Sequence, residues 1–285
     1  MDGPVSIEAR VAEQYGALGF ADAIVRIARI LATETALRRR GPLTARDLAS
    51  FDGLHIGGTA ATAGFLAKLQ IAPGTRWLDV GAGVGGASRH AVDTFGCHVT
   101  AIDITPEFCA AAETLNAAVG MSDRIAVVQG SALAMPFGAG AFDGAFTLHA
   151  GMNIEDKPTL YREVHRVLKS GAEFGIYDIL AGPAGGALKY PLPWAATPEA
   201  NFLVGIGELR RILDAAGFAS VRARDVTGYA RDFYRSTEAR EAAGRTRRSG
   251  PGSILGDEYY RRIANAGLGF EEGRCTAWGI IVRKP

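Results

Sequence analysis

The chain has 285 residues, of which 48% are hydrophobic, with 31 Lys and Arg against 30 Asp and Glu. This composition is enough to bury a large core, and it excludes a chain that is disordered throughout. Because the charges nearly cancel, nothing favours binding driven by phosphate groups, and we expect no nucleic-acid partner.

The cysteines and the first residues bear on location and on metal binding. Cys97, Cys109 and Cys275 are scattered and odd in number, which indicates reduced, buried thiols rather than a zinc site or a disulfide framework. Residues 1–10 carry no apolar run before a cleavage site, and no segment reaches the ~18 apolar residues that span a bilayer. We expect a cytoplasmic protein with no membrane partner and no metal.

The N-terminal part of the chain is predicted to be helical. Between Ile7 and about Arg40, apolar residues recur at steps of three and four, which predicts two amphipathic helices separated by glycines. Another helix is predicted over Gly58–Leu69. We therefore expect a helical cap over residues 1–70 and a main domain over residues 71–285.

From Arg76 onward, runs rich in β-branched residues alternate with helical stretches, which predicts stacked β-α-β units and a parallel sheet. The predicted strands are Arg76–Val80, His98–Ile102, Ile125–Gln129, Phe142–Leu148, Glu173–Ile179, Ser220–Asp225 and Ala277–Arg283. The predicted helices between them are Ala87–Phe95, Glu107–Val119, Lys157–Leu168 and Glu208–Ala216. The expected fold class is α/β, with a doubly wound, mostly parallel seven-stranded Rossmann-like sheet and an N-terminal helical cap.

Two stretches interrupt this alternation. Residues 181–206 are rich in Gly and Pro, and we predict an insertion that passes over the ligand edge of the sheet and covers the substrate. Residues 231–252 hold several arginines among acidic residues, which favours a solvent-exposed helix face and a loop over a functional basic patch.

A glycine-rich turn, within Leu78–Gly86, follows the first predicted strand. Glycine lets a ligand approach the backbone, and a tight turn there can require positive φ. Asp103 ends the next predicted strand, twenty residues beyond Gly83, where its carboxylate can accept two hydrogen bonds from a ribose diol. The turn and the carboxylate together indicate an adenosine ligand.

These residues alone leave the kind of adenosine cofactor open, because dinucleotide sites share the carboxylate and a similar turn. Asp79 favours a sulfonium cofactor, since a carboxylate before the glycines would repel a pyrophosphate but could hold an ammonium. The glycine spacing, G-x-G-x-G-G in place of G-x-G-x-x-G, favours it as well. A role for Asp79 in capping the turn, and a nicotinamide-dependent oxidoreductase, are the alternatives.

Further segments resemble the class I (Rossmann-like) S-adenosylmethionine-dependent methyltransferases. The similarity is to the branch of ubiquinone and menaquinone C-methyltransferases and sarcosine or dimethylglycine N-methyltransferases. It runs in the family's order from about Asp52 to Gly228. The matching segments are Leu78–Gly86, Ala101–Thr105, Gln129–Leu133, Met135–Phe137, Phe142–Asp143 and Tyr161–Gly171.

The resemblance implies S-adenosyl-L-methionine as the cofactor and assigns residues to its parts. The implied contacts are Asp79, Gly81, Gly83 and Gly85 for the methionyl part, Asp103 for the ribose, and Ile104, Ser131 and Ala132 around the adenine. Family members commonly place Asp where this chain has Ser131, so a hydroxyl or a backbone carbonyl must serve the adenine amino group.

Two histidines are candidates for catalysis. His149 follows the fourth predicted strand at the carboxyl edge of the sheet, where it can act as a general base or pack beside the cofactor and donate one hydrogen bond. His55 lies within Asp52–Gly58, which resembles a segment over the active site in the family's small-molecule branch. A purely structural role is the alternative for His55.

We expect the substrate to contact residues of the cap, of the turn after the fourth strand and of the Gly- and Pro-rich stretch. Met152 and Asn153 can line the sulfonium end of the cofactor, although a helix start also favours Asn153. Tyr15 is similar in placement to lid tyrosines of related N-methyltransferases. Tyr177, Tyr190 and Trp194 suit a planar or partly apolar substrate or a cation, and anchoring of the insertion is their alternative role.

The sequence therefore predicts transfer of a methyl group from S-adenosylmethionine to an N, O or C atom of a small-molecule acceptor. Most of the rate would come from proximity and orientation. The alternative is a protein of the same fold that binds the cofactor without methyl transfer, as a cyclase, an isomerase or a binding module. Assembly as a homodimer is left open.

Overall fold

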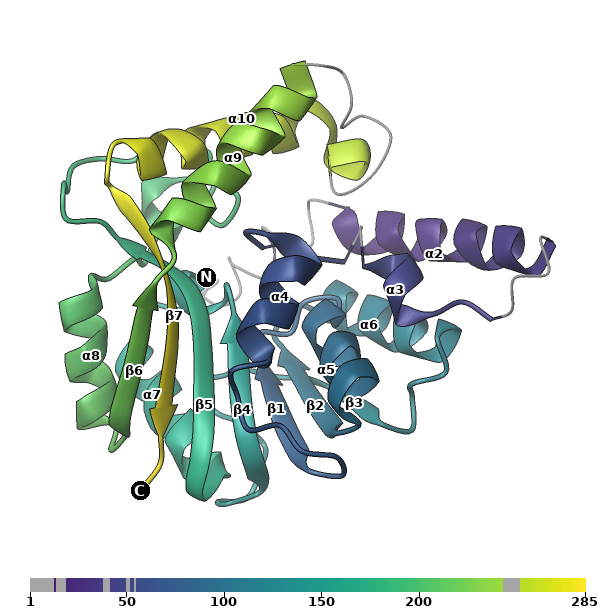
Figure 1. Ribbon diagram of the computed structural model, residues 1–285, viewed down its shortest axis with the longest axis horizontal. Coiled ribbons are helices and arrows are strands. Elements are labelled where there is room, and N and C mark those ends of the chain that lie inside the picture. The colour runs from purple at the N-terminus through teal and green to yellow at the C-terminus, as the bar shows by residue number, and fades with distance from the viewer. Residues whose placement is uncertain (1–12, 14–18, 38–41, 50–51, 54, 243–251) are drawn as a thin grey trace, which may run out of the picture.

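The computed structural model describes the chain except for residues 1–12, 14–18, 38–41, 50–51, 54 and 243–251. Seven strands form one sheet in the order β3-β2-β1-β4-β5-β7-β6, with helices on both faces (Figure 1). The first five strands run parallel to one another, and β7 runs antiparallel to β5 and β6. The expected fold class, a mostly parallel seven-stranded α/β sheet, is confirmed.

Every predicted strand is present, and the ends shift by a few residues except at the long fifth strand. The strands are β1 (Arg76–Val80), β2 (His98–Asp103), β3 (Ile125–Gln129), β4 (Phe142–Leu148), β5 (Leu168–Ala181), β6 (Ala219–Asp225) and β7 (Cys275–Arg283). The helices are α2 (Phe20–Leu37), α3 (Ala45–Leu48), α4 (Gly58–Leu66), α5 (Gly86–Phe95), α6 (Pro106–Ala118), α7 (Lys157–Val167), α8 (Ile206–Ala215), α9 (Thr227–Ala242) and α10 (Gly252–Glu271). Two short 3₁₀ helices are η1 (Gly151–Asn153) and η2 (Pro198–Ala200).

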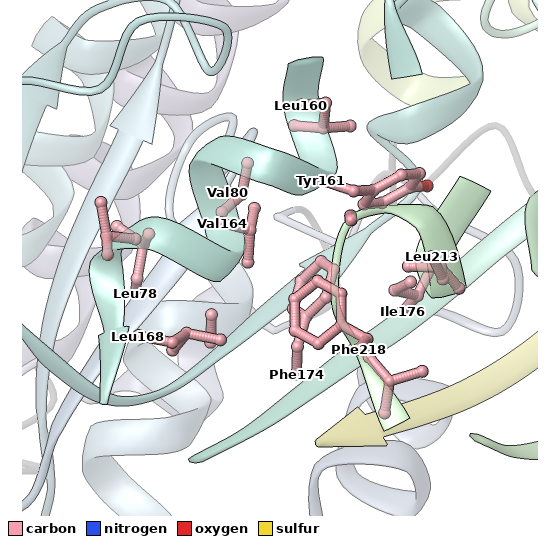
Figure 2. Close-up of a cluster of buried hydrophobic side chains, with 14 of the residues drawn as sticks. Leu78, Val80, Leu160, Tyr161, Val164, Leu168, Phe174, Ile176, Leu213 and Phe218 are labelled. Atoms are coloured by element: carbon pink, nitrogen blue, oxygen red, sulfur yellow. The ribbon is translucent and has the colours of Figure 1, made fainter. Parts of the chain in front are cut away.

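The alternation of side chains along the central strands divides the core between the two faces of the sheet. Leu78 and Val80 of β1 belong to a cluster with Val164 of α7 and Leu213 of α8, and Figure 2 shows these side chains together. Trp77, one residue before Leu78, is buried on the opposite face with α4 and α5. The sheet is thus covered on both sides, as near-continuous apolar strands require.

Within the described part of residues 1–70, the expected cap contains α2, α3 and α4, whose packing differs. Helix α2 packs against α6, in a cluster that includes Ile24 and Leu115. Helix α4 buries Phe65 and Leu66 directly on the sheet, beside Trp77. The division of the chain at residue 70 stays a prediction, as does the extent of the insertion over residues 181–206.

Helices α9 and α10 connect β6 to β7 and lie together beyond the carboxyl ends of the parallel strands (Figure 1). The sequence pattern predicted a helix face and a loop over residues 231–252, whereas α9 spans Thr227–Ala242 and the long α10 was not predicted. Within the described residues, none of the helices combines the length and the apolar character that crossing a bilayer requires.

Candidate functional site

A cavity of about 640 Å³ lies where the central parallel strands end. Gly81, Ile104 and His149, which directly follow β1, β2 and β4, all line it. The register explains this, because β1 pairs in parallel with both β2 and β4, so their carboxyl ends meet at one edge. This is the edge at which open α/β sheets bind ligands. The cavity is closed on its other side by residues of α9, α10 and the segment around Trp194.

The glycine-rich turn holds the end of β1 against β2. The N–H groups of Gly81 and Ala82 both donate to the carbonyl of Ile102, at 2.9 and 3.1 Å. Gly81 has a φ of 71°, and a Cβ at this position would clash with Ala150 after β4. Glycine is therefore required at Gly81 for its backbone conformation and for the close approach of the β4 segment.

The Asp103 carboxylate lies at the centre of the cavity-lining backbone. Its Oδ2 accepts a hydrogen bond from Gly83 N at 2.8 Å, and its Oδ1 accepts one from Thr105 N at 2.9 Å. Burial raises the pKa of Asp103, and these backbone N–H groups counter part of that shift. The Thr105 side chain and the Ile104 backbone also hydrogen-bond this carboxylate, so its orientation is fixed by several donors.

Asp79, the residue before Val80 at the end of β1, is 2% exposed and lines the same cavity. Its Oδ2 accepts a hydrogen bond from the Ser88 hydroxyl of α5 at 2.7 Å. Burial raises the pKa of Asp79 to about 7, with the Ser88 hydrogen bond opposing this shift and Asp103 adding to it. Asp79 therefore both anchors the first turn of α5 and presents a carboxyl group to the cavity.

Beside Asp103, Ile104 and Ala132 line the cavity, and Phe108 and Leu133 extend this apolar wall. Ser131 does not line the cavity, and its hydroxyl accepts a hydrogen bond from Leu133 N at 3.0 Å. Of the other two glycines expected to contact the cofactor, Gly83 lines the cavity, whereas Gly85, which caps α5, does not.

His149 and His55 lie side by side, with ring centroids 5.7 Å apart and the rings stacked. His55 Nε2 and the Thr62 hydroxyl are 2.8 Å apart, and its Nδ1 is 3.3 Å from the carbonyl of Ile56, so both ring nitrogens are engaged. His149 Nε2 is buried and has no hydrogen-bond partner among the described residues. Both rings line the cavity.

Both imidazoles are held neutral by their surroundings. Burial lowers the pKa of His55 to about 4, partly opposed by the Ile56 carbonyl. Burial, together with the neighbouring His55, lowers the pKa of His149 well below its usual range. A neutral imidazole carries one lone pair and one N–H, so the His149 ring can accept or donate one hydrogen bond to a ligand.

Met152 and Asn153 lie in η1 and line the cavity. Two buried polar residues, Asp178 and Lys157, hold this turn in position. Asp178 accepts from Met152 N at 3.1 Å, and the Lys157 ammonium donates to the carbonyl of Gly151 at 3.0 Å. Burial raises the pKa of Asp178 to about 7 and lowers that of Lys157 to about 8.

The four aromatic residues expected at the substrate fall in different places. Trp194 is buried and lines the cavity, with its indole N–H donating to Asn201. Tyr177 is buried between Phe65 and His149, and Tyr190 packs in the apolar cluster around Trp194; neither lines the cavity. Tyr15 lies outside the described residues.

Sequence reasoning missed a whole wall of the cavity, which α9 and α10 supply. The lining residues from these helices are Phe233, Tyr234, Glu258, Tyr259, Arg262 and Ile263. A helical signal was present, because the apolar residues Tyr259, Ile263, Ala266 and Phe270 recur at steps of four, three and four.

Comparison with known proteins finds a family model and several relatives that are similar to part of this chain. Residues 78–176 match the family model described as a methyltransferase domain. The chain is 29% identical over 219 residues to a glycine/sarcosine/dimethylglycine N-methyltransferase of Actinopolyspora halophila, which covers 75% of this chain and 38% of that protein. It is 38% identical over 113 residues to a sterol 24-C-methyltransferase of Gibberella zeae, which covers 40% of this chain and 30% of that protein.

The fold has solved counterparts as well. The crystal structure of a putative sarcosine dimethylglycine methyltransferase from Galdieria sulphuraria superimposes with a TM-score of 0.66 at 23% identity, covering 79% of this chain and 84% of that one. Residues 78–176 thus match a methyltransferase domain, and the chain has a fold found in methyltransferases. The chain is similar both to a glycine/sarcosine/dimethylglycine N-methyltransferase and to a sterol 24-C-methyltransferase, and it spans about a third of the length of these curated relatives.

Proposed function

We propose that this protein transfers the methyl group of S-adenosylmethionine to an N, O or C atom of a small molecule. The observation that carries this proposal is the single cavity that runs from the glycine turn and Asp103 to His149 and on to α9 and α10. One end has the chemistry that suits an adenosine cofactor, and the other is walled by apolar and aromatic side chains that suit a small organic acceptor.

The residues at the first end fit the cofactor. The glycine turn brings bare backbone to the cavity, and Asp103, which lines it, offers carboxylate oxygens to a ribose diol. Ile104, Phe108 and Ala132 offer an apolar slot for the adenine. The buried carboxyl of Asp79 is placed to offset the positive charge of an ammonium. Gly85 and Ser131 would act by shaping the turn and the adenine loop rather than by direct contact.

S-adenosylmethionine would supply an electrophilic methyl group on a sulfonium sulfur. The chain's part is to hold the acceptor in line with that group in a pocket that excludes water, and such positioning contributes up to about 7–11 kcal/mol in intramolecular models. Met152 and Asn153, which line the cavity, would flank the reacting centre, and Asp178 and Lys157 hold their turn η1 in position.

His149 is our candidate for the group that takes up the acceptor's proton. Burial keeps the ring neutral, so the imidazole carries one lone pair at physiological pH, and its Nε2 has no hydrogen-bond partner among the described residues. His55 already has a partner at each nitrogen, so it would position the stacked His149 ring rather than exchange protons with the acceptor.

The fold alone does not distinguish methyl transfer from another reaction on the same cofactor, so the test must detect the transfer itself. Calorimetric titration with S-adenosylmethionine and S-adenosylhomocysteine, with NAD as control, should show micromolar binding of the sulfur compounds and none of NAD. Incubation with candidate acceptors should then form one S-adenosylhomocysteine per methylated product. No binding of either sulfur compound would remove the proposal, and product without S-adenosylhomocysteine would replace it by a cyclase or isomerase.

The partner expected from this site is a small-molecule acceptor, and a cytoplasmic location and a homodimer stay predictions. The three cysteines, all buried and free, are consistent with a reducing compartment.

A further inference from the structure

Arg262 is the one Lys or Arg side chain that lines the cavity among the residues that the structure describes. It lies on α10, and its Nη1 donates to the carbonyl of Leu192 at 2.8 Å, which places the guanidinium beside Pro193 and Trp194. Its Nε donates to Glu258 Oε1 at 3.0 Å. Only 13% of the side chain is exposed, so two hydrogen bonds orient a largely buried guanidinium.

The Nη2 group of this guanidinium donates no hydrogen bond to any of the described residues. Glu258 does not neutralise the site either, because its carboxylate also forms an ion pair with Arg261. Two guanidinium groups share one carboxylate, so the cluster of Glu258, Arg261 and Arg262 keeps one net positive charge. The buried Arg262 shares its counter-charge with the exposed Arg261, so a ligand that brings one negative charge to Arg262 would complete the pairing.

The surroundings of Arg262 are apolar. Trp194, Tyr259 and Ile263 line the cavity from the same segments, and they offer dispersion contacts and aromatic faces but no charge. Apart from Glu258, the acidic residues of the lining come from other segments, namely Asp52 before α4, Asp79 and Asp103 at the ends of β1 and β2, and Glu155 and Asp156 before α7. Arg262 is thus the place in the acceptor half of the cavity where an anionic group would bind.

We propose that the methyl acceptor carries one carboxylate on an apolar or aromatic body, and that Arg262 binds this carboxylate through its free Nη2 edge. The single net charge of the cluster matches a carboxylate, whereas a phosphate monoester, with about −1.5 to −2 charges at neutral pH, would need a further cation. This inference rests on the proposed function, because it assigns the acceptor end of the same site.

The test compares carboxylates with uncharged molecules of the same shape. Benzoate, phenylacetate, cinnamate and hexanoate, each beside its primary amide, are titrated into the protein with and without S-adenosylhomocysteine, and binding is followed by NMR. The acids that bind should do so at least about tenfold more tightly than their amides, as expected for charge-assisted hydrogen bonds. The preference should vanish in Arg262→Gln.

Arg261→Gln is the matched control, since Arg261 pairs with the same Glu258 carboxylate but is 62% exposed and does not line the cavity. It should lower the preference for acids much less than Arg262→Gln does, because the cluster loses one charge but the Nη2 donor edge of Arg262 stays in place. Should Arg262→Gln fail to fold, Arg262→Lys retains the charge without the planar donor edge and should reduce the preference.

Four results would overturn the inference: no acid binds, the amides bind as tightly as the acids, the preference survives in Arg262→Gln, or that variant binds S-adenosylhomocysteine more weakly. The last would assign Arg262 to the cofactor instead. Failure of the proposed function is separate, because it appears as loss of S-adenosylhomocysteine binding in the unmodified protein.

Discussion

His149 and His55 occupy neighbouring positions on the same cavity, yet their hydrogen bonding differs, and the proposed function gives them different tasks. His55 is fixed by Thr62 and by the backbone at Ile56, and His149 keeps an unpartnered Nε2. From the sequence both were acid–base candidates, because a loop histidine carries no sign of its hydrogen bonds. The distinction depends on α4, which brings Thr62 to the His55 ring.

Replacing His149 by Asn should separate proton uptake from packing. His149 has a φ of 57°, a conformation that Asn tolerates well, so the backbone need not change. For an acceptor that loses a proton, we expect the turnover number to fall about 10²–10⁴-fold, with S-adenosylmethionine affinity largely kept. Single-turnover kinetics, with an acceptor that the unmodified protein methylates, measures the rate of the transfer step.

His55→Asn is the control for that experiment, and it should lower turnover far less because it acts only through the position of the neighbouring ring. An unchanged rate in His149→Asn would show that His149 does not take up the proton.

The buried carboxyl of Asp79 predicts a pH dependence of cofactor binding. Burial raises the pKa of Asp79 to about 7, so below pH 7 the free protein holds this group protonated and uncharged. An ammonium beside it favours the ionised form, so binding lowers the pKa and releases a proton. Affinity for S-adenosylhomocysteine should therefore rise with pH up to about 7 and then level off.

Calorimetry between pH 5.5 and 8.5, in buffers of different ionisation enthalpy, measures both the affinity and the released proton. Below pH 7 the dissociation constant should rise by up to about tenfold per pH unit, the limit for one proton. Asp79→Asn should bind more weakly at pH 8 and lose this dependence. An equal slope in that variant would assign the titration to another group.

Helix α5 is tied to the segment before α4 by a fully buried ion pair. Arg89 is 1% exposed, and its guanidinium donates to Asp52 at 2.9 Å, to Asn116 at 2.9 Å and to the carbonyl of Val84 at 2.8 Å. Through these bonds Arg89 links the residues before His55 to the glycine turn. One side chain thus holds two cavity-lining segments together, the one at Asp52 and the one at Val84.

Removing Asp52 should destabilise the protein strongly, because it leaves Arg89 buried without its counter-charge. We expect Asp52→Ala to lower the free energy of unfolding by about 3–5 kcal/mol, measured by urea denaturation. Glu271→Ala removes an exposed partner of Arg235 and should cost at most about 1 kcal/mol. The double variant Asp52→Leu with Arg89→Met should recover part of the loss, and equal losses in Asp52→Ala and Glu271→Ala would contradict the argument.

The helices and strands differ in how well the sequence predicts them. Strands β1 to β4 are short and apolar, and each is bounded by a turn or a helical stretch, so the pattern locates them to within a residue. Helix α10 was not predicted, because a non-helical residue, Gly256, interrupts its beginning. In addition, the charged residues around Glu258 and Arg262 resemble a solvent-exposed surface. Those charges pair with one another and with the carbonyl of Leu192, which lies far away in sequence.

At the scale of the whole molecule, the sequence predicts the sheet and the site residues that lie at the ends of its strands. Asp79, Gly81 and Asp103 come at strand ends, and parallel strand ends must gather at one edge. The wall opposite depends on how the connection between β6 and β7 folds back over that edge. Nothing local to Phe233 or Tyr259 specifies which surface they will face.

Strands β6 and β7 are antiparallel neighbours that a short turn could join, yet residues 226–274 separate them and provide α9 and α10. An excursion of this kind can change in length and sequence without altering the register of either strand. The glycine turn and Asp103 lie outside it. Descendants of this protein could therefore exchange one acceptor for another by remodelling a single insertion, while inheriting the machinery for the methyl donor intact.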